Sequence, residues 1–213
     1  MAVTLDEIHV ADPPHAWRDA GFTVDDDGTC RVGSVRIRLV GRARGTGIVG
    51  WSLRDLPGDA AATDVDGVPT ASSVTPPSTP ATHANGVTHL DHVVLLSPDV
   101  ARTRAALEAI GLDVRRERDG LLAGAPVRQL FLRLGEVILE VVGSPDETGD
   151  EPSTLWGLTH TVVDIEAAAA LLGGRTSPVK DAVQPGRRIT TLRHRDLGIS
   201  VRTALITPHV RAG

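Results

Sequence analysis

The stretch HLDHVVLLSPD, residues 89–99, starts the unit that decides the fold. His92 opens an apolar run that predicts a buried strand, and a Ser-Pro-Asp turn ends that run. A helix is predicted over 98–111, with Ser97 as its cap and Gly111 at its end. Three more strands should follow, which gives the order β-α-β-β-β. They are expected over residues 112–119, 127–135 and 136–143.

The same order recurs on both sides of this unit. In the C-terminal third we expect a strand, a helix, an extended segment and two strands, over residues 155–164, 165–174, 178–186, 187–195 and 198–207. In the N-terminal third a compressed version is predicted over residues 5–12, 13–21, 22–27, 34–41 and 47–56. Internal repetition of this kind is the strongest signal in the chain.

Composition breaks suggest where the repeats are joined. Residues 61–86 are predicted to be a linker, because 69–86 is rich in Pro, Ser, Thr and Ala and lacks apolar periodicity. The expected organisation is a degenerate module over 1–60, the linker, and modules over 87–143 and 154–208 that form one domain. Three modules leave one sheet edge unpaired, so a homodimer is predicted.

The bulk composition excludes several classes of function. The chain has 213 residues, a formal net charge of −5 and 41% hydrophobic residues, which is ordinary for a globular protein without a nucleic-acid footprint. Cys30 is the only cysteine, so no disulfide forms within the chain. No apolar stretch is long enough to span a membrane, and the N-terminus does not look like a signal peptide. A cytoplasmic protein that binds a small molecule, and neither nucleic acid nor membrane, is expected.

The repeated unit, with the phrases LDHVVL, LGEVILEVVG, LWGLTHTVVD and AVQPGRR, resembles the vicinal oxygen chelate superfamily. That group includes glyoxalases, extradiol dioxygenases and bleomycin-resistance proteins, and the chain is similar to an uncharacterised glyoxalase-like branch. The resemblance implies an α+β fold in which βαβββ modules pair into a cupped mixed sheet with helices outside. It also implies a divalent metal, held in the cup by a His from the first strand and a Glu from the last strand of each half.

His92 and Glu140 occupy the two ligand positions of the middle module. His92 is either such a ligand, a catalytic acid or base, or a structural strand histidine whose ring nitrogens are hydrogen-bonded. Strand alternation places Glu140 on the cup face, where a carboxylate among apolar neighbours needs a partner. Aligning Asp99 with Asp164 puts Gly157 at the His position, and the Glu position falls on Arg202.

We therefore expect an incomplete metal site. No cofactor is expected, and if a divalent ion such as Fe, Mn, Ni or Zn binds, His92 and Glu140 would hold it. Our hypothesis is that Arg202 stands where the metal charge would be and pairs with Glu140. By parity His160 should point away from the cup.

Three further residues are candidates for ligand contacts. Gln184 and Arg187 belong to a Pro-Gly turn that resembles a recurrent phrase of the glyoxalase-like branch. Trp156 is either a wall of the cup or part of the core.

Two functions follow from this resemblance. The first is a glyoxalase-like lyase or isomerase that moves a proton with His92 or Glu140, with or without metal. The alternative is a non-catalytic protein that binds or sequesters a small molecule, as bleomycin-resistance proteins do.

Overall fold

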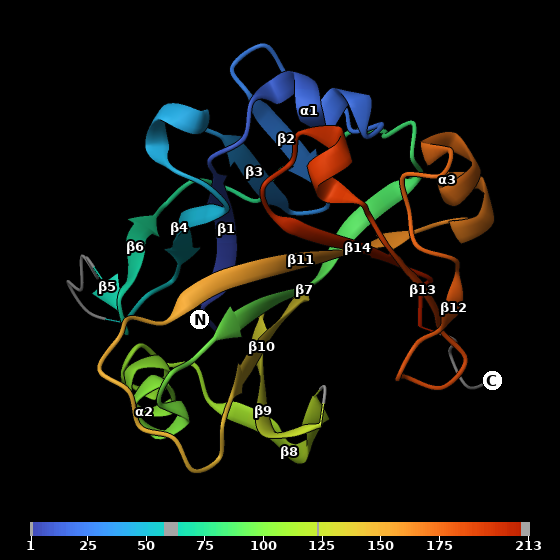
Figure 1. The fold of residues 1–213 in the computed structure, drawn as a ribbon. Coiled ribbons are helices and arrows are strands. Elements are labelled where there is room, and N and C mark those ends of the chain that lie inside the picture. The colour runs from blue at the N-terminus through green and yellow to red at the C-terminus, as the bar shows by residue number, and fades with distance from the viewer. Residues whose placement is uncertain (1, 58–63, 123, 210–213) are drawn as a thin grey trace.

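Two mixed β-sheets form the molecule, an eight-stranded sheet and a six-stranded sheet (Figure 1). The computed structural model describes residues 2–57, 64–122 and 124–209. Helices are few and short beside the strands, so the predicted α+β class is confirmed. Within the described ranges no helix is long and apolar enough to cross a membrane.

The eight-stranded sheet is built from the two C-terminal repeats, as predicted. Its strand order is β12-β13-β14-β11-β7-β10-β9-β8. The first half contains β7 (Val87–Leu96), α2 (Val100–Ala109), β8 (Val114–Leu122), β9 (Ala125–Leu134) and β10 (Val137–Gly143). The second contains β11 (Thr154–Val162), α3 (Ile165–Leu172), β12 (Lys180–Asp181), β13 (Arg188–Thr191) and β14 (Arg202–Ile206). The two halves meet where β7 and β11 pair antiparallel.

The two helices begin in the same way at equivalent positions. The side chain of Asp99 accepts a hydrogen bond from the backbone N–H of Arg102, and Asp164 does the same for two N–H groups of α3. Asp99 is therefore the cap of α2, and the prediction of Ser97 was wrong. An ionised carboxylate also interacts favourably with the positive end of the helix. The Ser97 hydroxyl instead bonds to Thr103 at 2.6 Å.

The six-stranded sheet takes the N-terminal residues, in the order β2-β3-β1-β4-β6-β5. Its elements are β1 (Thr4–Val10), α1 (Pro14–Asp19), β2 (Thr29–Val32), β3 (Val35–Leu39), η1 (Arg42–Arg44), β4 (Ile48–Arg54), β5 (Asp64–Val65) and β6 (Val68–Ser73). The strand expected over 22–27 is absent, and β2 starts later. The reason is a turn: Gly28 has φ +82°, and the Asp27 carboxylate accepts the Thr29 N–H at 3.0 Å.

Both sheets have the same symmetric plan. In each, two central strands pair antiparallel, β1 with β4 and β7 with β11, and each is flanked by a parallel strand. The flanking strands are β3 and β6 in one sheet, and β10 and β14 in the other. The six-stranded sheet thus repeats the central strand plan of the eight-stranded sheet. The sheet edge that motivated the homodimer prediction is covered by β6, so dimerisation stays a prediction without that support.

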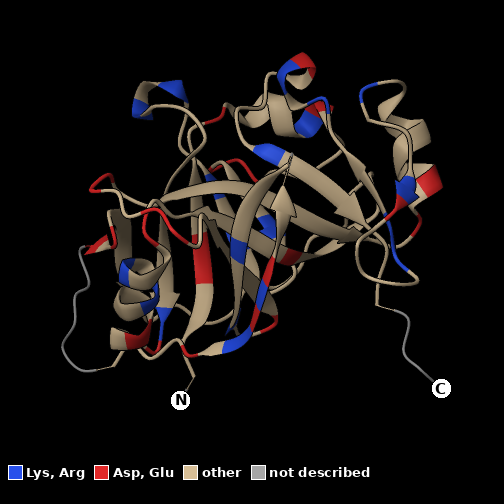
Figure 2. Cartoon of the chain, turned by 60° about the horizontal axis from the view of Figure 1, so that its bottom comes forward, with Lys and Arg blue, Asp and Glu red and all other residues tan. Residues whose placement is uncertain are grey.

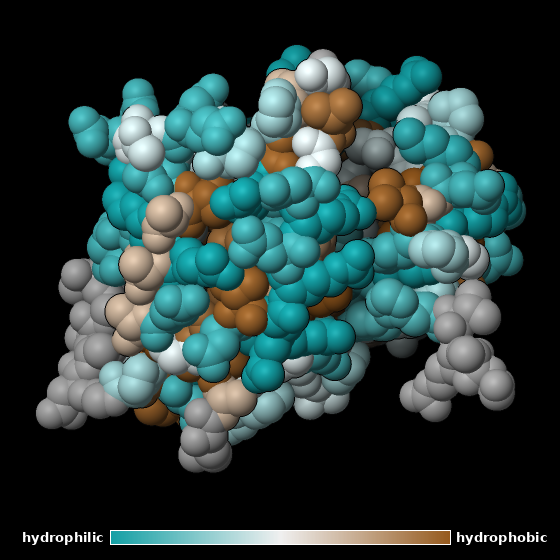
Figure 3. Space-filling view, turned by 90° about the horizontal axis from the view of Figure 1, so that it is seen from below, coloured by the Kyte–Doolittle hydropathy of each residue, from teal (hydrophilic) through white to brown (hydrophobic). Residues whose placement is uncertain are grey.

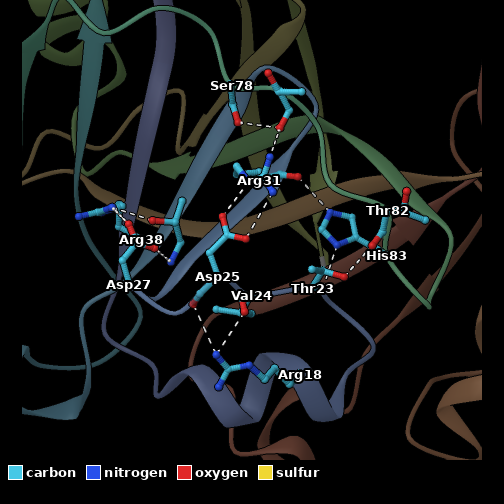
Figure 4. A network of polar contacts seen from close by, with 12 residues as sticks. Arg18, Thr23, Val24, Asp25, Asp27, Arg31, Arg38, Ser78, Thr82 and His83 are labelled. Carbon is cyan, nitrogen blue, oxygen red and sulfur yellow. Dashed lines mark hydrogen bonds and ion pairs between the residues drawn. The ribbon is translucent and has the colours of Figure 1, made fainter.

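The segment predicted as a linker is not a free tether. Its first part forms β5 and β6, and its remainder lies along the six-stranded sheet. Arg31 donates to the carbonyl of Thr79 at 2.8 Å and accepts the Ala81 N–H at 3.0 Å. His83 accepts the Thr23 N–H at 3.0 Å (Figure 4). Several polar groups of this segment therefore bond to the sheet, although most of its residues are exposed.

The core lies between the two sheets, on the face of the eight-stranded sheet opposite the cup. His160 points to this side, as parity predicted, and is fully buried. Its ring lies 6.3 Å from that of Trp17 and 5.2 Å from that of Phe22, both in the N-terminal half. Asp12 joins the halves as well, because it accepts the Ser200 N–H and hydroxyl at 2.9 and 2.6 Å.

Candidate functional site

The cup face of the eight-stranded sheet carries a cavity of about 450 Å³ that is lined by His92 and Glu140. Register places them in two neighbouring cross-strand rows. One row runs Arg202, Gly157, Val94, Glu140, and the next runs Ala204, Thr159, His92, Ile138. Neighbouring rows on one face place the imidazole and the carboxylate together: His92 Nε2 lies 3.8 Å from Glu140 Oε2. The two predicted side chains therefore do meet in the cup.

A bulge in β7 supplies His92 with a second partner. Asp91 is an extra residue between the pairs His92–Thr159 and Leu90–His160, so it leaves the strand's alternation. Its carboxylate Oδ2 lies 2.9 Å from His92 Nδ1. An Nδ1–H donated to this carboxylate leaves the Nε2 lone pair toward Glu140 and the cavity. His92 is thereby oriented as a proton acceptor or a ligand.

Asp91 is itself held by a buried ion pair with Arg187. The Arg187 guanidinium also donates to Gln184 Oε1 at 2.6 Å and to the carbonyl of Thr207 at 2.7 Å. Burial acts to raise the pKa of Asp91, but hydrogen bonds from His92 and Arg187 outweigh it and hold the pKa well below its usual range. Asp91 therefore stays ionised behind His92.

This arrangement changes the expected role of the Pro-Gly turn. Gln184 lines the cavity, as a ligand contact would require. Arg187 is only 1% exposed, so it has no free surface with which to touch a ligand. Its guanidinium N–H groups donate to Asp91, Gln184 and the Thr207 carbonyl, so Arg187 influences the site through Asp91.

Glu140 finds its partner on β9. The Gln129 side-chain N–H donates to Glu140 Oε1, and Arg118 donates to Gln129 Oε1, its Nε at 2.9 Å. The hypothesis that Arg202 neutralises Glu140 is thus wrong for this structure, because a neutral amide holds the carboxylate. Arg118, Arg116 and Arg133 also line the cavity, which makes its outer wall cationic. Figure 2 shows such positively charged residues (blue) within the strands as well as in loops.

Register also corrects the alignment of the last strand. Gly157 pairs with Arg202 as His92 pairs with Ile138. Arg202 is therefore equivalent to Ile138, and the position of Glu140 falls on Ala204. The sequence alignment relied on Gly198 as the opening of that strand. Gly198 instead ends the 3-10 helix η2 (His194–Leu197), with φ +72°.

Trp156 is the counterpart of Asp91. It is the extra residue of a bulge in β11, between the pairs Leu155–Leu95 and Gly157–Val94. The two bulges coincide when Asp99 is aligned with Asp164, which supports the match of Gly157 to His92. Trp156 is 42% exposed and belongs to a cavity wall rather than to the core. The Arg202 Cζ atom lies 4.7 Å from its ring centroid.

The donor set does not fit the four-residue metal site that the resemblance implies. Gly157 and Ala204 stand at the other two ligand positions, and neither has a side-chain donor atom. Across the parts of the chain that the structure describes, no group of three or more His, Cys, Asp or Glu side chains could hold a metal ion. Of the four ligand positions, only those of His92 and Glu140 carry a donor atom.

Sequence reasoning missed three residues of this site: Asp91, Gln129 and Arg118. Asp91 was missed because regular alternation would place its side chain on the other face of the strand from His92. Only the bulge brings the two side chains together. Gln129 could have been found from the sequence. It shares a strand face with Phe131, which pairs with Glu140 across β9 and β10.

Comparisons with known proteins support the fold. No family model and no curated protein sequence matches the chain. Among solved structures, a mutant of 4-hydroxymandelate synthase from Streptomyces coelicolor matches with a TM-score of 0.64 and 14% identity, covering 100% of this chain and 94% of that one. A xylose isomerase-like TIM barrel/4-hydroxyphenylpyruvate dioxygenase fusion protein matches with a TM-score of 0.60 and 13% identity, covering 99% of this chain and 49% of that one.

A third neighbour is methylmalonyl-CoA epimerase from Mycobacterium tuberculosis, at 18% identity and a TM-score of 0.46, covering 59% of this chain and 91% of that one. At these identities the matches speak for the fold alone. The first two matches extend over both sheets of this chain. The two matches with TM-scores of 0.64 and 0.60 support the vicinal oxygen chelate fold that the sequence resemblance predicted.

Proposed function

We propose that the cup binds a small, oxygen-rich organic molecule and moves a proton at a carbon next to its carbonyl group. The observation that carries this proposal is the chain of contacts Arg187–Asp91–His92–Glu140. In it, the Nδ1–H of His92 donates to the Asp91 carboxylate, and Nε2 lies beside the Glu140 carboxylate in a cavity. Geometry of this kind suits general acid–base catalysis.

Each residue has a part in the proposed reaction. Nε2 of His92 accepts the proton from the substrate carbon, and Asp91 stabilises the imidazolium that forms. Glu140, held by Gln129, lies beside Nε2 and binds the substrate, and the imidazolium of His92 returns its proton to the carbon directly or by way of Glu140. Arg116 and Arg133 at the cavity wall suit the oxygens of a polar substrate. The outcome is isomerase or lyase chemistry of the glyoxalase kind.

Isotope exchange tests this proposal without a known substrate. A panel of small 2-oxo and 2-hydroxycarbonyl compounds is incubated with the protein in D2O, and deuterium uptake next to the carbonyl is followed by proton NMR. We expect uptake with the wild type and its loss in His92→Gln and Glu140→Gln. His89→Gln and Glu147→Gln are matched controls away from the cavity and should retain exchange. Equal exchange in all five proteins would refute the assignment.

The competing function is binding without chemistry. It is favoured by one observation, the lack of donor atoms at Gly157 and Ala204. In that case a compound from the panel would bind the wild type, and His92→Gln would weaken its binding, but no deuterium would enter it. The same experiment, with binding followed by ligand-observed NMR, therefore separates the two functions.

A further inference from the structure

A second cavity, of about 540 Å³, lies on the same cup face in the other half of the sheet. Its floor is made of small residues: Gly157, Thr159, Ala204 and Val94. Trp156 and Arg202 form one wall, and the loop after β13 forms the other with Arg193, His194 and Arg195. It is related by the two-fold plan of the sheet to the cavity at His92 and Glu140.

Positive charge in this cavity is poorly balanced. Within residues 2–57, 64–122 and 124–209, neither Arg193, Arg195 nor Arg202 forms an ion pair with an acidic side chain. Asp196 is the acidic residue of the lining. All three arginines are exposed, and guanidinium groups that line one cavity without an acidic partner are suited to a carboxylate or a phosphate.

Trp156 adds a second and independent feature. Its indole is 42% exposed at the cavity wall, whereas the two other tryptophans are fully buried. The Arg202 guanidinium stacks at 4.7 Å from its ring centroid, which fixes the cation in place while leaving its N–H donors at the rim. Burial and the neighbouring Arg202 lower the pKa of His194, so that the imidazole on the facing wall favours its neutral form.

The row geometry links this cavity to the first one. Arg202 and Glu140 are in one cross-strand row with only Gly157 and Val94 between them. Three strand spacings separate their Cα atoms by about 14 Å. Long side chains from both ends shorten that gap to the length of a small organic acid.

We propose that the cavity of Trp156, Arg193, Arg195 and Arg202 is an anion subsite, which binds the carboxylate or phosphate of the molecule that reacts at His92 and Glu140. This inference rests on the proposed function and names its substrate class as an organic anion. The anionic group lies against Arg202, and its planar or apolar part lies beside the Trp156 indole over the small-residue floor.

Three probes with one ring test the subsite: benzoate, phenyl phosphate and benzamide. We expect benzoate or phenyl phosphate to quench Trp156 fluorescence saturably, and neutral benzamide not to do so. Whichever anion binds more tightly identifies the group that the subsite takes. Arg202→Gln should weaken anion binding about 10-fold or more, as expected for a lost charge-assisted pair. Arg128→Gln, which removes a surface arginine outside the cavity, should leave it unchanged.

Calorimetry with the same probes provides a readout that does not depend on the tryptophan. Binding of benzamide as tight as that of the anions, absence of saturable anion binding, or equal affinity in Arg202→Gln and wild type would overturn the inference. His92→Gln separates it from the proposed function. That variant should lose isotope exchange but keep anion affinity, whereas failure of the subsite alone would leave exchange intact and anion binding insensitive to Arg202.

Discussion

Acid should destabilise this protein through one histidine in its core. His160 is fully buried and, among the described residues, neither ring nitrogen has a hydrogen-bond partner. Burial, helped by the neighbouring histidines, lowers its pKa from 6.5 to about 3. The unfolded chain therefore takes up this proton first as the pH falls below 6.5. The stability that neutral His160 permits is present above that pH and is lost progressively toward pH 3.

The size of the effect follows from the shift. Linkage costs about 1.4 kcal/mol per pH unit between the two pKa values, which amounts to about 2 kcal/mol between about pH 7.5 and about pH 5. His83, whose pKa burial also lowers, adds a loss of the same sign. Replacing His160 by leucine removes only the first contribution, so comparison of the variant with the wild type isolates it.

Urea unfolding at the two pH values measures the free energies. The difference in unfolding free energy between His160→Leu and the wild type should move by about 2 kcal/mol in favour of the variant on going to the lower pH. His15→Leu, at an exposed histidine, should track the wild type. Equal losses in His160→Leu and the wild type would show that His160 is protonated or hydrogen-bonded in the folded state, and the reasoning would fail.

Three more outcomes are expected. Asp91→Asn should lower stability by about 3 to 5 kcal/mol in thermal or urea unfolding, because it leaves the buried Arg187 without its counter-charge, and Asp91→Asn/Arg187→Leu should recover part of this loss; no recovery would contradict the pairing. Trp156→Phe should abolish most of the fluorescence that acrylamide quenches, since Trp17 and Trp51 are 0% exposed; unchanged quenching would place the indole inside. Exhaustive treatment with a chelator should leave the melting temperature and probe binding unchanged, and metal analysis that finds a stoichiometric ion lost in Glu140→Ala would contradict the incomplete ligand set.

Much of the fold could be predicted from the sequence, because its signals are local and repeated. The apolar run from His92, the matching strand–helix junctions at Asp99 and Asp164, and the glycine turns all report on near neighbours. The pairing of β5 with β6 was not predicted, because the Thr and Ser residues in 69–73 are as common in a short strand as in a loop. Seen from below, the surface is mostly hydrophilic, with hydrophobic residues visible between the polar ones (Figure 3).

The site was predicted less well, for a physical reason. Parity correctly indicated that His92 and Glu140 share the cup, but it holds only while strands are regular. The extra residues Asp91 and Trp156 break that alternation, and they are the residues that orient His92 and Arg202. The alternation of side chains along a strand does not reveal a bulge. Gly198, which ends a 3-10 helix, also looks in the sequence like a glycine that opens a strand.

The close approach of two strands at Gly157 limits which side chains this position can take. A Cβ atom there would lie 3.1 Å from the backbone oxygen of Arg202, closer than such contacts normally are. A histidine placed at this position could direct a nitrogen into the cup only if β14 shifted slightly. Ala204 would have to change as well. A second His and Glu pair in this sheet would thus need two changes, and the backbone contact at Gly157 opposes one of them.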